Sequence, residues 1–139
     1  PHLSARLDGV EIRMNAFLLP DSPRPVLVEG AGGLLVPLND DALMIDLIVQ
    51  LGLPVVLVAR SGLGTINHTL LSVEALRSRN LPLVGVVMNG LPNEPNREAV
   101  ETYGRVPVIG QLPHMDDLSA DSLAAMTPPH IPGFEMILS

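Results

Sequence analysis

Apolar residues gather in four short runs, separated by segments with a helical pattern. The runs are VLV from Val26, PVVLVA from Pro54, LVGVVM from Leu83 and VPVIG from Val106. None of them alternates between polar and apolar positions, which is typical of strands buried on both faces of a parallel sheet. Each run is followed by a turn that contains glycine or proline, so each is predicted to be a strand.

Four further segments have the spacing of amphipathic helices. In one of them, Leu43, Leu47 and Leu51 recur at every fourth position. The predicted helices span residues 41–51, 65–79, 96–103 and 119–126, with a weaker helical pattern from Ser4. This alternation of strands and helices predicts an α/β fold, a three-layer α/β/α arrangement around a mostly parallel sheet. We expect a single domain over residues 1–139, with an irregular tail over 127–139.

The composition narrows the class of protein. Apolar residues make up 47% of the 139 residues and aromatic residues only 2%, so the core is expected to be aliphatic. The net charge is -7 and the eight basic residues are scattered arginines, which disfavours nucleic-acid binding. The absence of cysteine excludes disulfides and thiolate catalysis. No signal peptide and no apolar run of about 18 residues is present, so we expect a soluble, cytoplasmic protein without a membrane partner.

Candidate chemistry follows the predicted strands, because ligands of open α/β sheets bind outside the carboxyl ends of the strands. The first run ends in EGAGG, from Glu29 to Gly33. A carboxylate offers oxygen ligands to Mg²⁺, and glycines let backbone N–H groups come close to an anion. A solvated strand end with a simple turn is the plainer interpretation. Three glycines behind a carboxylate are more than a turn requires, so we favour the metal and anion site.

The later strand ends carry weaker signals. RSGLGTINHT, from Arg60, leads into a predicted helix whose free N–H groups form an anion site; an ordinary turn with Thr65 as N-cap is compatible with this. The amide of Asn89 suits a nucleobase edge, but Asn89-Gly90 equally suits a turn, which the residues alone favour. QLPHM, which ends at Met115, is a loop stiffened by proline and indicates little by itself.

Together these segments resemble dethiobiotin synthetase in sequence, order and spacing. The resemblance covers residues 1 to about 113, and GTINHT is its most specific part. It rests on the segments PHLSA from Pro1, VEGAGG from Val28, GLGTINHTLL from Gly62, GVVMNG from Gly85 and PVIGQLP from Pro107. The resemblance implies a P-loop NTPase-like fold and a homodimeric ligase of biotin synthesis. Such an enzyme joins CO₂ to 7,8-diaminononanoate and closes the ureido ring, with MgATP as the co-substrate.

The resemblance also implies roles for residues. Glu29 would be a Mg²⁺ ligand. The ATP-binding positions would be Glu29, Gly30, Ala31, Gly32, Asn89, Gly90, Pro113, His114 and Met115, with the amide of Asn89 on the adenine edge. The substrate-binding positions would be Gly64, Thr65, Ile66 and Asn67, which would hold the substrate carboxylate across the dimer interface.

The chain departs from this family at its beginning. It has no GxxxxGK sequence followed by Ser or Thr, and no lysine at all. The P-loop, a second catalytic lysine and an aspartate metal ligand of the family are missing, so no catalytic residue is assigned. We expect no ligation by this chain alone, and either a longer polypeptide or a partner that covers the exposed sheet edge. The alternatives are a non-catalytic binding or regulatory module, and another amidoligase of the cobyrinic acid type.

Overall fold

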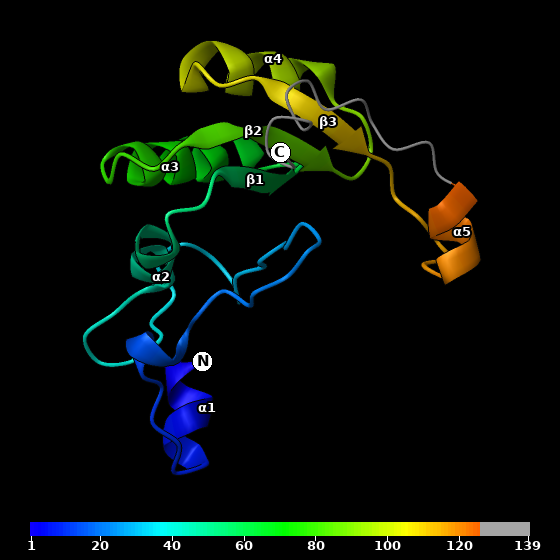
Figure 1. Cartoon of the computed structure of the whole chain (residues 1–139). Helices are drawn as coiled ribbons and strands as arrows, with labels where there is room; N and C mark the ends of the chain where they lie inside the picture. Colours follow the sequence, from blue (N-terminus) through cyan, green and yellow to red (C-terminus); the bar gives the residue numbers. More distant parts are fainter. Residues whose placement is uncertain (126–139) are drawn as a thin grey trace. The chain divides into compact units, whose positions relative to one another are not determined.

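The computed structural model describes residues 1–125, and these fall into two compact units (Figure 1). The N-terminal unit consists of Pro1–Leu53 and Arg79–Leu81, and the sheet unit takes in Pro54–Ser78 and the chain from Pro82 onward. The single domain predicted for residues 1–139 stays a prediction. The irregular tail predicted for 127–139 lies outside the described residues.

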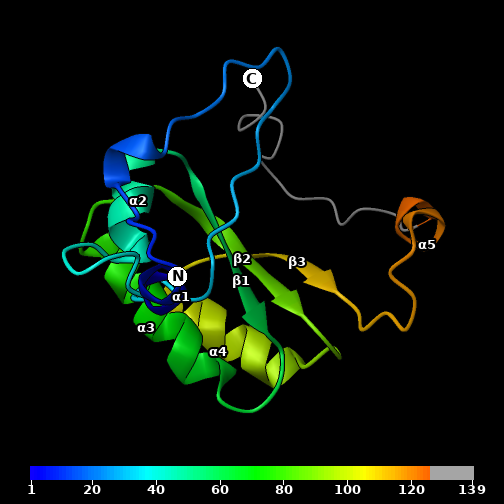
Figure 2. The same ribbon diagram turned by 90° about the horizontal axis from the view of Figure 1, so that it is seen from below.

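The sheet unit is built on three parallel strands in the order β1-β2-β3. The strands are β1 (Val55–Arg60), β2 (Leu83–Asn89) and β3 (Val108–Leu112). Their arrowheads point the same way in Figure 2. At the carboxyl edge Arg60 pairs with Asn89, and Asn89 pairs with Leu112. The predicted α/β class with a parallel sheet is therefore confirmed, and the three strands end side by side.

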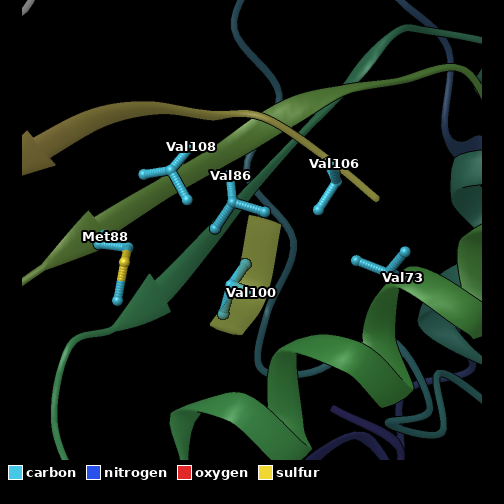
Figure 3. Packing of buried hydrophobic residues seen from close by; sticks show 6 residues of the cluster. All are labelled: Val73, Val86, Met88, Val100, Val106 and Val108. Atoms are coloured by element: carbon cyan, nitrogen blue, oxygen red, sulfur yellow. The ribbon is translucent and has the colours of Figure 1, made fainter. Parts of the chain in front are cut away.

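Two helices, α3 (Thr65–Arg77) and α4 (Glu94–Gly104), pack on one face of this sheet. Figure 3 shows the core between these helices and the sheet, where side chains from both helices meet those of the strands. Its members are all Val or Met, as the scarcity of aromatic residues led us to expect: Val73, Val86, Met88, Val100, Val106 and Val108. Val86, Met88 and Val100 are fully buried. This packing fixes the ends of the strands and the starts of both helices.

The N-terminal unit contains α1 (His2–Leu7), the 3-10 helix η1 (Met14–Ala16) and α2 (Met44–Leu51). Its core cluster consists of the buried residues Leu38, Met44 and Leu47, and the partly buried Ile12, Met14 and Leu51 pack against them. The Gln50 side chain donates hydrogen bonds to the backbone oxygens of Met14 and Phe17, at 3.0 and 3.1 Å. The apolar face of the helix predicted over residues 41–51 thus packs against Ile12 and Met14, which precede it in the chain.

The first predicted strand, VLV from Val26, is wrong. Val26, Leu27 and Val28 are 42%, 93% and 44% exposed, and no segment among the described residues pairs with them. Apolar composition favours a strand only where a neighbouring strand accepts its backbone hydrogen bonds. The other three runs have such neighbours within the sheet unit.

Side-chain caps moved the boundaries of two predicted helices. The helix predicted from Asp41 begins at Met44, with Leu43 as N-cap, whose N–H donates to the Asp46 carboxylate at 2.8 Å. The Asn39 side chain accepts hydrogen bonds from the N–H groups of Asp41 and Ala42 and so holds these two residues in a turn before the helix. The helix predicted from residue 96 begins at Glu94, because Asn93 caps it. Proline is tolerated in that first helical turn. The helices predicted over 65–79 and 119–126 are observed as Thr65–Arg77 and Ala120–Ala125, and Met126 is not among the described residues.

Candidate functional site

The carboxyl edge of the sheet unit brings three of the predicted segments together. Hydrogen bonds continue the sheet for one residue past its strands: the N–H of Ser61 donates to the Asn89 oxygen at 3.0 Å, and that of Gly90 to the Leu112 oxygen at 2.9 Å. The loops after β1, β2 and β3 therefore begin from one aligned row of backbone. The candidate residues Asn89 and Gly90 lie in this row, and those at 64–67 and 113–115 follow it.

Asn89 ends the central strand with its side chain exposed. No residue among 1–125 forms a hydrogen bond with its side-chain amide, so the donor and the acceptor of this amide are both available there. Gly90 has a φ of +124°, and a Cβ there would lie 2.7 Å from the Ser61 Oγ. The turn and the available amide thus coexist: Gly90 makes the turn, and Asn89 keeps its amide free.

The loop between β1 and α3 ends on Gly64, whose φ of +88° is a left-handed conformation that favours glycine. The Thr65 hydroxyl does not face solvent. It lies 3.3 Å from the Thr69 hydroxyl, and both side chains are buried. Within residues 1–125 nothing accepts a hydrogen bond from the N–H groups of Ile66 and Asn67. Any anion at this helix start would meet backbone donors rather than the Thr65 side chain.

The third segment, Pro113 to Met115, leaves β3 with two exposed residues and a half-buried Met115. The His114 Nε2 lies 3.5 Å from the Asp116 Oδ1, and both side chains are largely exposed. Nearby, the Ser119 hydroxyl and N–H donate to the Asp117 carboxylate, which lowers the pKa of Asp117. These bonds start α5 and have no evident chemical role.

Glu29, Gly30, Ala31 and Gly32 belong to the N-terminal unit, and all four are exposed. No hydrogen bond within residues 1–125 involves them. Gly32 has a φ of +84°, which an L-residue rarely adopts, so a glycine is required there for backbone reasons alone. The segment presents a carboxylate and open backbone, which are the groups that a metal and an anion use.

Glu29 stands without a preformed set of metal ligands. Residues 1–125 contain no group of three or more His, Asp or Glu side chains arranged to hold a metal ion. Mg²⁺ keeps several waters and is commonly bound through one or two carboxylates together with substrate phosphates. Glu29 offers one such carboxylate, and the described part of the chain forms no metal cage around it.

Three residues with no role predicted from the sequence hold the carboxyl edge together: Ser61, Asn96 and Gln111. Ser61 is buried, and its backbone oxygen accepts a hydrogen bond from the Asn96 Nδ2 at 2.9 Å. The Gln111 Nε2 donates to the Gly90 oxygen at 3.0 Å. These contacts join residues 35 and 21 positions apart, which no local pattern reveals.

A hollow of about 660 Å³ lies beside the start of α3. Its lining is mainly apolar: Leu63, Gly64, Ile66, Asn67, Leu70, Asn93 and Asn96. The Leu63 side chain, which lines one side of the hollow, is 99% exposed to solvent. Residues 1–125 also contain no helix with the length and apolar character needed to cross a membrane.

Known proteins match this chain over most of its length. A family model described as "AAA domain" matches residues 1–122. A Paramagnetospirillum magneticum protein named "ATP-dependent dethiobiotin synthetase BioD" is 50% identical over 129 residues, covering 93% of this chain and 63% of that protein. A Brucella ovis protein of the same name is 54% identical over 123 residues, covering 88% and 58%.

A third relative carries a further activity in its name. The "Biotin biosynthesis bifunctional protein BioCD" of Bordetella avium is 54% identical over 123 residues, which is 88% of this chain and 26% of that protein. The chain thus spans between about a quarter and two thirds of the length of these relatives. The resemblance drawn from GTINHT and its neighbouring segments is confirmed by these matches.

Proposed function

The chain belongs to the AAA domain family, and from this premise we propose that it serves ATP-dependent dethiobiotin synthesis. The observation that carries the proposal is the 50–54% identity to proteins named for this activity, over 88–93% of the chain. Since the chain covers only 58–63% of those two relatives, the activity is proposed for the natural polypeptide that carries it. The free amide of Asn89 at the sheet edge supports the nucleotide part of the proposal.

The proposed reaction uses one ATP for each ring closed. An amine of 7,8-diaminononanoate adds to CO₂ to form a carbamate, and a carbamate oxygen attacks the γ-phosphorus, releasing ADP. The second amine then attacks the carbonyl carbon of the mixed anhydride. Inorganic phosphate leaves, and the ureido ring closes. Catalysis of these steps requires that the reacting groups are held in position and that negative charge on the phosphate oxygens is stabilised.

For ATP, we propose that Asn89 pairs with the edge of the base. A primary amide carries a donor and an acceptor side by side, as the adenine edge does in the complementary order. The exposed side chain of Asn89 is fixed at its backbone by the bond from Ser61. Gly90 beside it, and Pro113 to Met115 at the end of β3, would flank the base.

For the substrate, we propose that the loop from Gly64 to Asn67 holds the carboxylate. The N–H groups of Ile66 and Asn67 are available as donors within the described residues, and the helix dipole favours an anion there by about 0.3–1 kcal/mol. Gly64 and Thr65 would contribute backbone and shape, since the Thr65 hydroxyl is turned inward. We also propose that the protein is a homodimer, in which this loop serves the substrate held by the other subunit, and that it works in the cytoplasm.

For the metal, we propose that Glu29 binds Mg²⁺ and that Gly30, Ala31 and Gly32 line the phosphates with backbone N–H groups. The exposure of all four residues and the open backbone support this. The metal would supply charge neutralisation for the phosphate oxygens. No lysine of this chain can do so, because it has none. We therefore expect no dethiobiotin from the 139-residue chain alone.

Product analysis tests the proposal. The natural polypeptide, supplied with 7,8-diaminononanoate, bicarbonate and MgATP, is expected to form dethiobiotin and one ADP per product, measured by mass spectrometry and coupled ADP release. Omission of any one component should abolish the product. ATP consumption without dethiobiotin, or ATP- and glutamine-dependent amidation of a carboxylate, would contradict it and favour another ligase. Glu29→Gln should raise the Mg²⁺ concentration needed for half-maximal rate, while Glu98→Gln, an exposed change on α4, should not.

A further inference from the structure

Ser61, the residue after β1, is the most buried polar position of its loop. It is 4% exposed, although Gly62, Leu63 and Gly64 after it are all exposed. Both of its backbone groups are used. The N–H donates to the Asn89 oxygen at 3.0 Å, and the oxygen accepts from the Asn96 Nδ2 at 2.9 Å. Ser61 therefore links the end of β2 to the first turn of α4.

Asn96 presents its amide from a well-fixed element. It is the third residue of α4, and its own N–H donates to the capping oxygen of Asn93 at 3.1 Å. One turn further on, Val100 is fully buried in the core of the sheet unit. The partner of Asn96 is a carbonyl oxygen, so only the NH₂ end of its amide can make this contact. The donor is thus held in place by the helix, not by the loop it reaches.

The loop that Asn96 holds is short. Four residues, from Ser61 to Gly64, join β1 to α3, and the Thr65 N–H donates back to the Gly62 oxygen at 3.2 Å. With so few residues, a fixed peptide at Ser61 limits the positions open to the start of the helix. The N–H groups of Ile66 and Asn67 lie at that start.

We propose that Asn96 is a positioning residue, which sets the loop from Gly64 to Asn67 through the Ser61 carbonyl and so determines affinity for the carboxylate-bearing substrate. This rests on the proposed function, since it takes that loop as the binding site of the substrate carboxylate. Asn96 itself need not touch the substrate. Its loss should weaken substrate binding more than nucleotide binding, because Asn89 is also held by strand pairing with Arg60 and Leu112, which does not involve Asn96.

Three substitutions of Asn96 distinguish the loss of its hydrogen-bond donor from a change in the stability of α4. Asn96→Asp replaces the NH₂ by an acceptor that faces the Ser61 oxygen, while an acidic residue in the first turn suits the helix dipole. Asn96→Leu has a similar size and no polar group. Asn96→Gln keeps a primary amide on a longer side chain. Thr102→Asp, an exposed position on the same helix, is the control for added charge.

Steady-state kinetics of dethiobiotin formation by the natural polypeptide gives the test. We expect Asn96→Asp and Asn96→Leu to raise the KM for 7,8-diaminononanoate about tenfold or more, with the KM for ATP changed less than about threefold. Asn96→Gln should recover part of the loss, and Thr102→Asp should match the unsubstituted protein. The shifts of the Ile66 and Asn67 amide signals in nuclear magnetic resonance should follow the same order, and they report on the loop independently of turnover.

The outcomes distinguish the two proposals. If the unsubstituted protein makes dethiobiotin and the Asn96 variants retain its KM for 7,8-diaminononanoate, the positioning role is overturned and the proposed function stands. Equal increases in both KM values, with a lowered unfolding temperature, would mean a structural role and would also overturn it. If the unsubstituted protein makes no dethiobiotin, the proposed function fails, and this inference fails with it.

Discussion

The sheet unit and the N-terminal unit hold their candidate residues in opposite ways. In the sheet unit, Ser61 and Gly90 are bonded to the neighbouring strand ends, and the side chains of Asn96 and Gln111 hold the loops from behind. In the N-terminal unit, Glu29 to Gly32 are exposed, and no hydrogen bond among the described residues involves them.

This difference has an energetic consequence. Groups that are fixed by folding can bind a ligand without a further loss of conformational freedom, whereas fixing a free backbone costs about 1–2 kcal/mol per residue. Base recognition by Asn89 in the sheet unit should therefore depend little on the metal. The contribution of Glu29 to Gly32 should depend strongly on the ligand that orders them.

The largest contrast is expected between two glycines. A Cβ on Gly85 of β2 would lie 2.6 Å from the Ile109 Cγ2 and 2.9 Å from the Pro107 oxygen, whereas Gly33 has open space around it. Gly85→Ala should destabilise the sheet unit by about 2–3 kcal/mol through overpacking. Gly33→Ala should change stability by less than about 0.5 kcal/mol. Urea unfolding, followed by amide signals of each unit, measures both; equal effects would show that the sheet is less tightly packed than described.

A second contrast concerns two arginines. Arg77 donates to the backbone oxygens of Gly104 and Arg105, both at 2.7 Å, and so closes the end of α4. Among residues 1–125, the Arg6 side chain is paired with Asp40 alone, and both of these side chains are exposed. Arg77→Ala should cost about 1–2 kcal/mol, because it leaves two carbonyl groups without their charged donor. Arg6→Ala should cost less than about 0.5 kcal/mol. Urea unfolding measures both changes in the free energy of unfolding. A larger loss of stability from Arg6→Ala than from Arg77→Ala would contradict the comparison.

A smaller effect, of opposite sign, is expected at two residues in the left-handed conformation. Arg105 of the sheet unit has a φ of +47°, and Asn80 of the N-terminal unit has a φ of +54°. Arg105→Gly should stabilise by about 0.5–1 kcal/mol, since glycine removes the strain of a Cβ there. Asn80→Gly should gain less, because asparagine tolerates this conformation. A loss of stability from Arg105→Gly in thermal unfolding would mean that its side chain contributes contacts not seen in the fold.

The smallest effect is expected at the start of α5. The Ser119 hydroxyl and N–H lower the pKa of Asp117 below its ordinary value of 3.8. Its stabilising contribution is therefore fully present above that value and is lost as the pH falls through the lower pKa of the folded state. A carboxyl titration by nuclear magnetic resonance should give a midpoint below 3.8, and Ser119→Ala should raise it. A midpoint unaffected by Ser119→Ala would remove the hydrogen bond as its cause.

The sequence predicted most of the sheet unit, since its three apolar runs are separated by helices of the right length. It failed at Val26 to Val28, where the composition is equally apolar but strand formation depends on a neighbour that no local pattern specifies. Two helices begin at other residues than predicted, because the Asn39 side chain holds residues 41 and 42 in a turn and the Asn93 side chain caps α4. The cap at Asn93 follows a sequence rule, since asparagine is among the residues preferred directly before a helix.

Within the candidate site, the rule that ligands lie beyond strand ends correctly placed Asn89 at the sheet edge. The inward direction of Thr65 could also have been read from the sequence, because Thr65, Thr69, Val73 and Leu76 recur at the spacing of one buried helix face. Ser61 and Asn96 could not, since they meet through a backbone oxygen and a distant amide. Contacts of this kind depend on the packed fold.

The affinity for ATP tests the central claim most directly, namely that the fixed carboxyl edge of the sheet unit recognises the nucleotide. The equilibrium dissociation constant would be measured by calorimetry for the natural polypeptide, for Asn89→Ala, and for Leu71→Ala, an exposed control on α3. We predict about tenfold weaker ATP binding for Asn89→Ala, the value of one good hydrogen-bonded contact of about 1.4 kcal/mol, with and without Mg²⁺. Leu71→Ala should bind as the unsubstituted protein does. Unchanged ATP affinity in a folded Asn89→Ala variant would contradict the account.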